Sequence, residues 1–283
     1  MAGAGRLPRL ALLCLLLCTA TAWADGLPRL AVVIDDLGNR WARDVRAVAL
    51  PGVYSFALLP HTPYARALAW RIRAQGKEVL LHLPMEPRGD QRPGPGALWM
   101  VQTRPRLLAT LRADLAAVPF VSGVSNHMGS RLTESPRAMA WVMAELARRP
   151  GLYFLDSRTS AASRAFAVAR RSGLPSLARD VFLDHERDPE AVRRQLMRAV
   201  ERARERGQAV AIGHPYAVTL EVLEYWLPRL DGRRVRLVPA RDLAFQRVRS
   251  PEPWPTSSSP SPRVVKNWKP SPSSTCCDVP GWR

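Results

Sequence analysis

Short apolar runs alternate with longer amphipathic stretches from about residue 30 to residue 243. Short continuous apolar runs are typical of strands buried on both faces of a parallel sheet, and the stretches between them carry apolar residues at the spacing of a helix face. The predicted strands cover residues 30–34, 52–60, 78–84, 120–127, 152–156, 174–184, 209–215 and 235–240. This pattern predicts an α/β fold in which helices cover a parallel sheet.

The stretches between the strands carry the start and stop signals of helices. The predicted helices cover residues 62–77, 104–118, 135–151, 159–173, 188–208 and 219–230. In the clearest of them, Asp188 is the N-cap, Pro189 is the first helical residue and Gly207 ends the helix. Seven or eight strand–helix units in one chain predict a distorted (β/α) barrel of parallel strands, and a doubly wound open sheet is the alternative.

The first 24 residues have the layout of a secretory signal peptide. Arg6 and Arg9 form a basic start, residues 10–17 form an apolar run, and residues 22–24 form an A-x-A cleavage site. The apolar run is too short to span a bilayer comfortably, although an uncleaved anchor is the alternative. We therefore expect cleavage after Ala24, export to the periplasm or the extracellular space, and no transmembrane segment in the mature chain.

The composition changes after Arg249 and divides the mature chain in two. Residues 25–249 form the predicted barrel domain, whereas residues 250–283 are rich in Pro and Ser, lack an apolar period and read as a disordered tail. Only Cys276 and Cys277 remain after signal cleavage. Adjacent cysteines rarely pair with each other, so no disulfide framework is predicted.

The formal net charge is +18, and most of the basic residues are arginines. Such a surplus is also found in nucleic-acid-binding proteins, but here the arginines are spread over many predicted helix faces without a basic patch interleaved with aromatic residues. We therefore expect no nucleic-acid partner. An exported basic protein is suited to anionic envelope material, and a solvated arginine surface without a partner is the alternative.

Polar residues gather where the predicted strands end. They are Asp35 and Asp36, His82 with Glu86 four residues later, Asn126 and His127, Asp156, Asp180 and Asp184, and His214. Taken singly, each is commonly a helix cap, a turn residue or a hydrogen-bonded structural histidine. The carboxyl ends of parallel strands converge on one face, however, so the sequence predicts that these acids and imidazoles share one rim.

The adjacent carboxylates of Asp35 and Asp36 would repel each other in a site of low dielectric constant. A divalent cation removes this difficulty, because one carboxylate binds the metal while its neighbour stays free to accept a proton. Imidazole and carboxylate ligands together favour zinc or a similar transition metal over magnesium or calcium. We therefore expect a divalent metal, with zinc as the first choice.

The same segments resemble the polysaccharide deacetylases. "VVIDDLG" resembles their first motif, in which a strand ends in Asp-Asp-Gly or a close variant, and "EVLLHLPME" resembles their second motif. "GVSNHMGSRLT", "FLDSRTS", "RDVFLDH" and "IGHP" match the divergent polysaccharide deacetylases more closely. The resemblance covers residues 30–243 and implies the distorted barrel of that family.

The resemblance also implies roles for individual residues. It makes Asp35 the catalytic base, Asp36 and His82 metal ligands, and His214 the general acid. Either Asp156 or Asp184 is expected to hold His214 in the required tautomer and raise its pKa.

The resemblance departs from the family pattern at the third metal ligand. Glu86 stands where the second motif carries another histidine, so either His127 or Glu86 completes the metal site, with His127 favoured. An ion pair between Arg179 and Asp180 is expected to orient the base, with a plain structural salt bridge as the alternative. Arg179, Asp180 and Asn126 are also expected to contact substrate.

The implied activity is metal-dependent removal of N-acetyl groups from an envelope polysaccharide, such as peptidoglycan or another N-acetylated glycan. Two alternatives remain open. The same barrel could bind a glycan or an envelope protein without catalysis, as the Glu86 departure allows. It could also be a glycoside hydrolase that pairs Asp35 with Asp156 or Asp184, although glycosidases need no imidazole cluster.

Overall fold

The computed structural model describes residues 26–246 of the chain. The predicted signal peptide, the whole of the predicted tail and both remaining cysteines lie outside these residues. No helix in the described part is long and apolar enough to cross a membrane.

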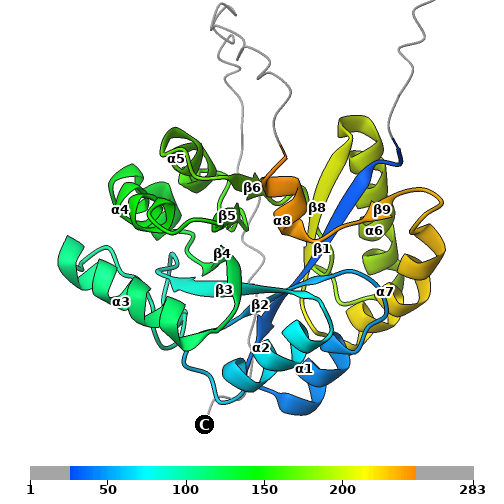
Figure 1. Cartoon of the computed structure of the whole chain (residues 1–283), viewed down its shortest axis with the longest axis horizontal. Coiled ribbons are helices and arrows are strands. Elements are labelled where there is room, and N and C mark those ends of the chain that lie inside the picture. The colour runs from blue at the N-terminus through cyan, green and yellow to red at the C-terminus, as the bar shows by residue number, and fades with distance from the viewer. Residues whose placement is uncertain (1–25, 247–283) are drawn as a thin grey trace, which may run out of the picture. The chain divides into compact units, whose positions relative to one another are not determined.

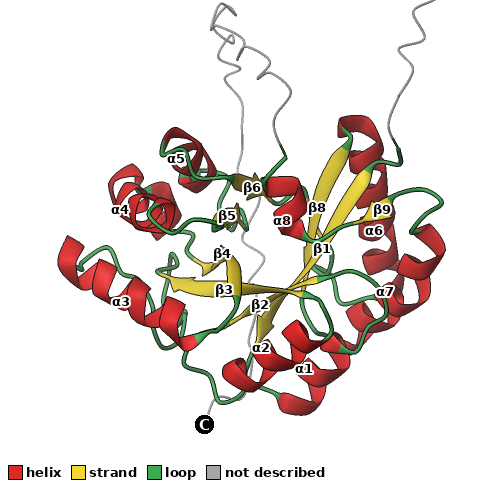
Figure 2. Cartoon of the chain, viewed as in Figure 1, coloured by secondary structure: helices red, strands yellow, loops and turns green. Residues whose placement is uncertain are grey.

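All the strands of the described region belong to one sheet, and every pairing is parallel. In chain order they are β1 (Arg29–Leu37), β2 (Ser55–Leu58), β3 (Glu78–Met85), β4 (Val121–Met128), β5 (Tyr153–Asp156), β6 (Ser176–Ala178), β7 (Val181–Phe182), β8 (Gln208–Gly213) and β9 (Arg236–Leu237). The order across the sheet is β6-β5-β4-β3-β2-β1-β8-β7, and β9 pairs with β1 beside this path. The predicted distorted (β/α) barrel is confirmed as a curled sheet surrounded by helices (Figures 1 and 2).

The chain between β6 and β7 explains why the barrel is distorted. These strands lie at opposite edges of the sheet, yet only Arg179 and Asp180 separate them in sequence. The amide of Arg179 donates to Asp156 on one edge, and the amide of Asp180 donates to Val210 on the other. The sheet must therefore curl until its edges nearly meet. The segment 174–184, expected to contain one strand, holds two short strands, because the chain changes edges in its middle.

Helices follow most of the strands, and all of them except the last cover the outer face of the sheet (Figure 2). They are α1 (Trp41–Val48), α2 (Ala65–Ala74), α3 (Arg104–Ala117), α4 (Pro136–Ala147), α5 (Ala165–Arg171), α6 (Pro189–Arg206), α7 (Ala217–Leu230) and α8 (Ala240–Ala244), with a 3-10 turn at Leu132–Glu134. The predicted caps of α6 are confirmed, because Asp188 accepts from the amide of Ala191 and Gly207 adopts a left-handed conformation. The short helix α1 was not among the predicted elements, since its N-cap residue Arg40 makes no side-chain cap.

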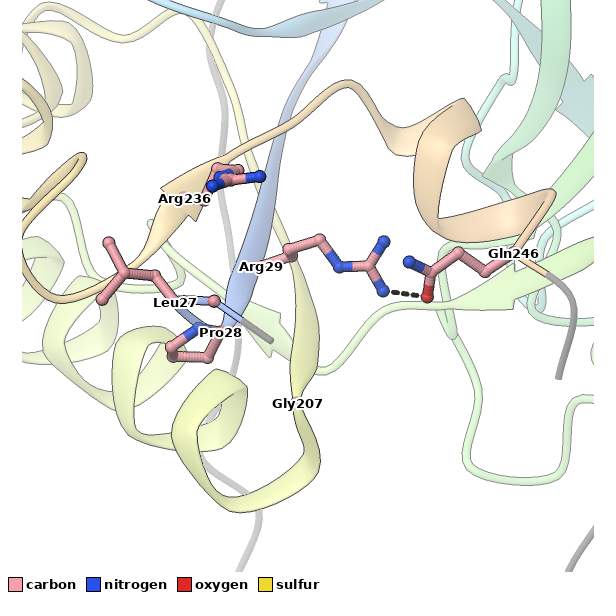
Figure 3. A pocket seen from close by; sticks show the side chains of 7 residues that line it. Leu27, Pro28, Arg29, Gly207, Arg236 and Gln246 are labelled. Atoms are coloured by element: carbon pink, nitrogen blue, oxygen red, sulfur yellow. Dashed lines mark hydrogen bonds between the residues drawn. The ribbon is translucent and has the colours of Figure 1, made fainter. Parts of the chain in front are cut away.

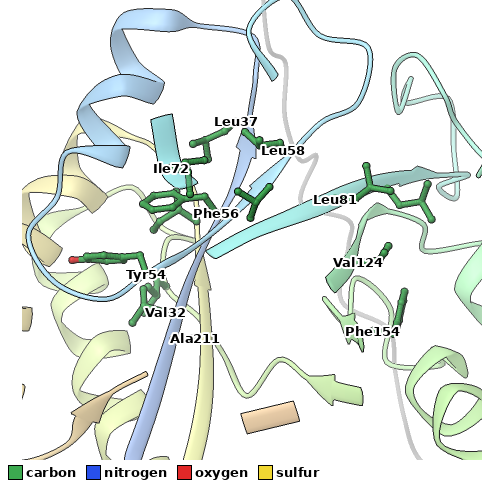
Figure 4. Packing of buried hydrophobic residues seen from close by; sticks show 14 of the residues in the cluster. Val32, Leu37, Tyr54, Phe56, Leu58, Ile72, Leu81, Val124, Phe154 and Ala211 are labelled. Carbon is green, nitrogen blue, oxygen red and sulfur yellow. The ribbon is translucent and has the colours of Figure 1, made fainter. Parts of the chain in front are cut away.

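Side chains alternate between two apolar layers along β1, β2, β3, β5 and β8. Val32, Phe56 and Leu81 belong to the large outer layer, which packs between the sheet and the helices (Figure 4). Val33 and Tyr153 belong to a smaller layer inside the curl, together with residues of α8. The sheet therefore has apolar packing on both faces, as its continuous apolar strands predict.

A buried carboxylate ties together the amino ends of the strands inside the curl. Glu78 accepts hydrogen bonds from Ser55, Ser122 and Tyr153, and also from the amide of Arg241 in α8. All four donors come from different elements, so this network links strands β2 to β5 with α8. The predicted chemistry is instead concentrated at the opposite, carboxyl ends of the strands.

Candidate metal centre and active site

Three of the predicted site residues meet at the carboxyl ends of β1, β3 and β4. The Oδ1 atom of Asp36 lies 3.1 Å from Nε2 of His82 and 2.9 Å from Nδ1 of His127. The three possible ligand atoms all lie within 4.8 Å of one another. Within residues 26–246, no other group of three such side chains comes together in this way.

The backbone at the end of β1 explains how two consecutive carboxylates reach one place. Asp36 has φ of 64°, in the left-handed region, and the pairing of β1 with β2 shifts register between Ile34 and Leu37. Successive side chains of a regular strand point to opposite faces, and such an irregularity breaks this alternation. Nε2 of His82 consequently lies 3.6 Å from Asp35 as well as 3.1 Å from Asp36.

The turn after these carboxylates is fixed by side chains that the sequence did not single out. Asp44, at the start of α1, accepts hydrogen bonds from the amides of Gly38 and Arg40. Arg43 pairs with Asp44 and donates to the backbone carbonyl of Asp36. The left-handed conformation of Asp36 is therefore held from both sides of the turn.

The cluster of Asp36, His82 and His127 fits a divalent metal. Oδ1 of Asp36 is buried and has no hydrogen-bond partner of suitable geometry, even though two imidazole nitrogens lie within 3.1 Å of it. Ligand atoms about 2.0–2.2 Å from a tetrahedral zinc are separated from one another by roughly 3.3 Å. The other nitrogen of His82 lies 2.8 Å from the hydroxyl of Ser125, the kind of outer contact that orients a metal-binding imidazole.

The two carboxylates have opposite titration behaviour. Burial raises the pKa of Asp35, although the nearby His82 and His214 partly oppose this shift. Burial also acts on Asp36, but its contacts with His127 and His82 outweigh it and hold the pKa well below its usual value. Asp35 is therefore the neighbour with the greater proton affinity, and its Oδ1 atom is buried without a hydrogen-bond partner.

His214 completes this group from the end of β8. Its Nε2 lies 3.7 Å from Oδ2 of Asp36, and its Nδ1 lies 3.0 Å from Oδ1 of Asp184. The second oxygen of Asp184 accepts from the amide of His214 and from the hydroxyl of Thr219. Burial lowers the pKa of His214, but the hydrogen bond to Asp184 and the charge of Asp36 raise it to about 9. Of the two acids expected to hold His214, the structure places Asp184 there.

Three other predicted site residues have different partners. Glu86 pairs with Arg131 at 2.8 Å and accepts from the amide of Met100, so its carboxylate is engaged on the loop after β3. Of the two candidates for the third ligand, the structure therefore brings His127, and not Glu86, to the cluster. Asn126 and Asp156 also have local partners.

The partners of Asn126 and Asp156 stabilise the loops around the site. The amide group of Asn126 donates to the carbonyl of Met128, and its oxygen accepts from the amide of Ser157. The carboxylate of Asp156 accepts from Arg158, Ser163 and Phe166 of the segment after β5. The side chain of Asp156 thus orders its own loop and does not hold His214.

The expected ion pair between Arg179 and Asp180 is absent from the described region, so that prediction is wrong. Arg179 donates to the backbone carbonyls of Ser157 and Arg158. Asp180 turns the other way, pairs with Arg206 and accepts from the amide of Val210. The side chains of Arg179 and Asp180 have different partners because the chain passes from one edge of the sheet to the other between these residues.

Sequence reasoning missed the side chains that support the site. Ser125 and Thr219 orient His82 and Asp184, and Tyr216 lies beside His214 with ring centroids 5.5 Å apart. Two of them stood within the quoted motif segments or next to them, since Ser125 precedes "NH" and Tyr216 follows "GHP". Their roles depend on contacts between distant strands, which the sequence pattern does not encode.

A separate pocket lies at the opposite end of the sheet, where β1, β8 and β9 begin. It is lined by Leu27, Pro28, Arg29, Gly207, Arg236 and neighbouring residues (Figure 3). Arg29 donates to Gln246 across it. None of the three possible metal ligands, Asp36, His82 and His127, lines this pocket, so the pocket is not the candidate active site.

Comparisons with known proteins identify relatives of this chain. YibQ, an uncharacterized protein of Escherichia coli (strain K12), is 38% identical over 196 residues, which are 69% of this chain and 61% of that relative. An uncharacterized protein of Haemophilus influenzae is 34% identical over 253 residues, covering 88% of this chain and 90% of the relative. This chain therefore spans only about three fifths of YibQ but nearly the whole of the second relative.

A solved structure shares the fold. The crystal structure of an uncharacterized protein from Agrobacterium tumefaciens C58 superimposes with a TM-score of 0.74 and 26% sequence identity, covering 78% of this chain and 90% of that one. A sequence model described as divergent polysaccharide deacetylase matches residues 32–244, which include every member of the metal cluster. The chain belongs to the divergent polysaccharide deacetylase family.

Proposed function

We propose that this protein is a metal-dependent hydrolase that removes N-acetyl groups from an envelope polysaccharide. The observation that carries the proposal is the buried Oδ1 atom of Asp36, which lies within 3.1 Å of two imidazole nitrogens without a hydrogen bond. A neighbouring carboxylate and a carboxylate-bound histidine flank this cluster. The family membership supports the same class of chemistry.

Asp36, His82 and His127 would hold the metal, and zinc suits their one oxygen and two nitrogens. When bound, the divalent cation supplies a Lewis acid that polarises an amide carbonyl and makes water more acidic. Ser125 keeps the ring of His82 in place from behind. Glu86 takes no part in this set, because Arg131 holds it elsewhere.

Asp35 serves as the general base. It lies beside the cluster, 3.6 Å from the ring of His82, and burial raises its pKa above that of a free carboxyl. A base is most effective when its pKa lies near the working pH, so this shift favours proton transfer from the attacking water. The low pKa of Asp36 leaves that carboxylate free for the cation.

His214 serves as the general acid that protonates the departing amine. Its ring faces Asp36 on one side and Asp184 on the other, and its pKa is raised to about 9. The side chain is therefore cationic at neutral pH, as a proton donor must be before the carbon–nitrogen bond breaks. Asp184, fixed by Thr219, keeps the second ring nitrogen bonded and the ring in position.

Features of the sequence support the proposed substrate and compartment. The predicted export signal and the net charge of +18 support an acetylated glycan of the cell envelope as substrate, such as peptidoglycan. The family membership supports a polysaccharide rather than a small amide.

Acetate release tests the proposal. Purified protein loaded with zinc is incubated with N-acetylated oligosaccharides, and the products are followed by acetate detection and mass spectrometry. We expect acetate and a free amine, with no new reducing ends. Release of reducing ends without acetate would assign the protein to the glycoside hydrolases, and glycan binding without any product would indicate a binding module.

A further inference from the structure

A wall of stacked side chains borders the candidate acid. Phe182 of β7 lies edge-on to the ring of His214, with centroids 5.4 Å apart, and Tyr216 lies on the same ring at 5.5 Å. Arg187, from the loop between β7 and α6, places its guanidinium 3.9 Å from the centre of the Tyr216 ring. The same guanidinium donates to the phenol oxygen of Tyr216 at 2.9 Å.

Arg187 therefore has a fixed position without an acidic partner. Its side chain is exposed, and no carboxylate within residues 26–246 comes within ion-pair distance of it. The adjacent Asp188 is committed to capping α6. By contrast, Arg193, in the second turn of α6, pairs with Glu190. A guanidinium held by a stack and a hydrogen bond has already lost much of its conformational freedom, so it can bind an anion at low entropic cost.

A second cation flanks the same wall. Arg179 lies 5.0 Å from the ring of Phe182, and its described contacts are with carbonyl oxygens and not with a carboxylate. The candidate acid His214 thus contacts two aromatic rings, and an arginine lies against each of these rings. Two guanidinium groups without a carboxylate partner among the described residues therefore border this side of the site.

We propose that Arg187, held in place by Tyr216, binds an anionic group carried by the N-acetylated sugar, a carboxylate or a phosphate, and so selects acidic glycans. The inference rests on the proposed deacetylase function, because it assigns the substrate class of the same site. A guanidinium matches the two oxygens of a carboxylate or phosphate with two parallel hydrogen bonds. Arg187 would then determine specificity without contacting the reacting amide.

Matched substrates test the role of this charge. The first pair is the disaccharide of N-acetylglucosamine and N-acetylmuramic acid, and the same compound with its carboxylate converted to the methyl ester. N-acetylglucosamine 6-phosphate and N-acetylglucosamine form the second pair, which distinguishes phosphate from carboxylate recognition. Acetate release gives kcat/KM, and calorimetry gives the dissociation constant in parallel.

We expect the wild-type protein to favour the charged member of one pair by about tenfold or more, in line with the loss of one charged hydrogen-bonded pair. Arg187→Gln should remove this preference and leave the neutral member within about twofold. Tyr216→Phe keeps the ring and removes one hydrogen bond, so it should lower the preference less. Arg193, a partly buried arginine on α6, pairs with Glu190 and lies against Trp226. Arg193→Gln is therefore the control, and it should change kcat/KM for neither member of a pair.

Two results would overturn the inference. Equal kcat/KM for the charged and neutral members in the wild-type protein would show that the protein does not recognise the anionic group of the substrate. An equal loss for both members in Arg187→Gln would show that the arginine only supports the fold of the site. If no substrate releases acetate, the proposed function fails, while the dissociation constants of the same pairs still decide whether Arg187 recognises the anion.

Discussion

Buried carboxylates at the two ends of the curled sheet differ in whether their oxygens have hydrogen-bond partners. At the amino end, Glu78 accepts hydrogen bonds from three hydroxyls and one backbone amide, so both of its oxygens are satisfied. At the carboxyl end, Asp35 and Asp36 each bury an oxygen that has no hydrogen-bond partner. An unsatisfied buried polar atom costs free energy, so two such atoms on adjacent carboxylates beside two imidazoles call for an explanation. The first carboxylate stabilises the fold, whereas the proposed function assigns the other two to binding a cation and accepting a proton.

Exchanging the two neighbouring aspartates for asparagine should separate their roles most strongly. Asp35→Asn removes the base, so we expect kcat to fall by about 10³-fold or more while the metal stays bound. Asp36→Asn should lose both metal and activity. Metal content by mass spectrometry and acetate release measure both effects. Loss of metal in Asp35→Asn, with metal retained in Asp36→Asn, would mean that the two roles are reversed.

The network at the amino end should respond in stability alone. Glu78→Gln replaces an oxygen acceptor by an amide donor that faces hydroxyls and a backbone amide, so we expect a loss of about 1–3 kcal/mol in the free energy of unfolding. Metal content of the folded protein should equal that of the wild type. Urea denaturation gives the first value, and metal analysis gives the second. A change in metal affinity would show that the two ends are coupled.

A contact behind the metal ligands should have an intermediate effect. Ser125→Ala removes the hydroxyl 2.8 Å from Nδ1 of His82, and loss of such outer contacts typically weakens metal affinity about 10- to 100-fold. Competition with a chelator of known affinity measures this change. Ser122→Ala in the same strand contacts Glu78 instead, and it should leave metal affinity unchanged. Equal metal affinity in both variants would contradict the assigned role of Ser125.

A third buried carboxylate, that of Asp114, has one oxygen with a partner and one without. Its substitution should have the smallest effect. Asp114 lies in α3, and the oxygen that has a partner is 2.8 Å from His61. Burial raises the pKa of Asp114 to about 7, although His61 opposes the shift. Because the pKa in the folded protein exceeds the ordinary value of 3.8, the folded protein binds this proton more tightly than the unfolded chain does. The resulting contribution to stability is complete below about pH 3.8 and is lost as the pH rises through about 7.

Asp114→Asn should therefore remove part of the pH dependence of stability. We expect the wild-type free energy of unfolding to fall, relative to the variant, by on the order of 1 kcal/mol between pH 5 and pH 8. Denaturant titrations at the two pH values measure this difference. A difference that stays constant, or that changes in the opposite direction, would show that Asp114 is already ionised at pH 5.

The sequence predicted the parts of the fold that depend on local pattern. The apolar runs located β1, β3, β4, β5 and β8, and the cap signals located α6, because burial and capping leave a periodic trace in the chain. The division of residues 174–184 into β6 and β7 was not predicted. It depends on which distant strand each half pairs with, and a run of apolar residues carries no such information.

The same limit applies to the site: positions at strand ends could be predicted from the sequence, whereas contacts across the sheet could not. The polar residues at strand ends identified Asp36, His82, His127 and His214, since parallel strands bring these ends together. The choice between Asp156 and Asp184 could not be made from the sequence. Both follow a strand, and only the contacts across the sheet show that Asp184 reaches His214 while Asp156 caps its own loop.

The central claim is that Asp36, His82 and His127 share one cation. Anomalous diffraction at the zinc edge, from crystals grown with zinc, tests it most directly. The account predicts one strong peak about 2.0–2.2 Å from a carboxylate oxygen of Asp36, Nε2 of His82 and Nδ1 of His127. Glu86 should remain paired with Arg131 in the same crystal. A peak bound by Glu86 in place of His127, or no peak among these side chains, would contradict the account.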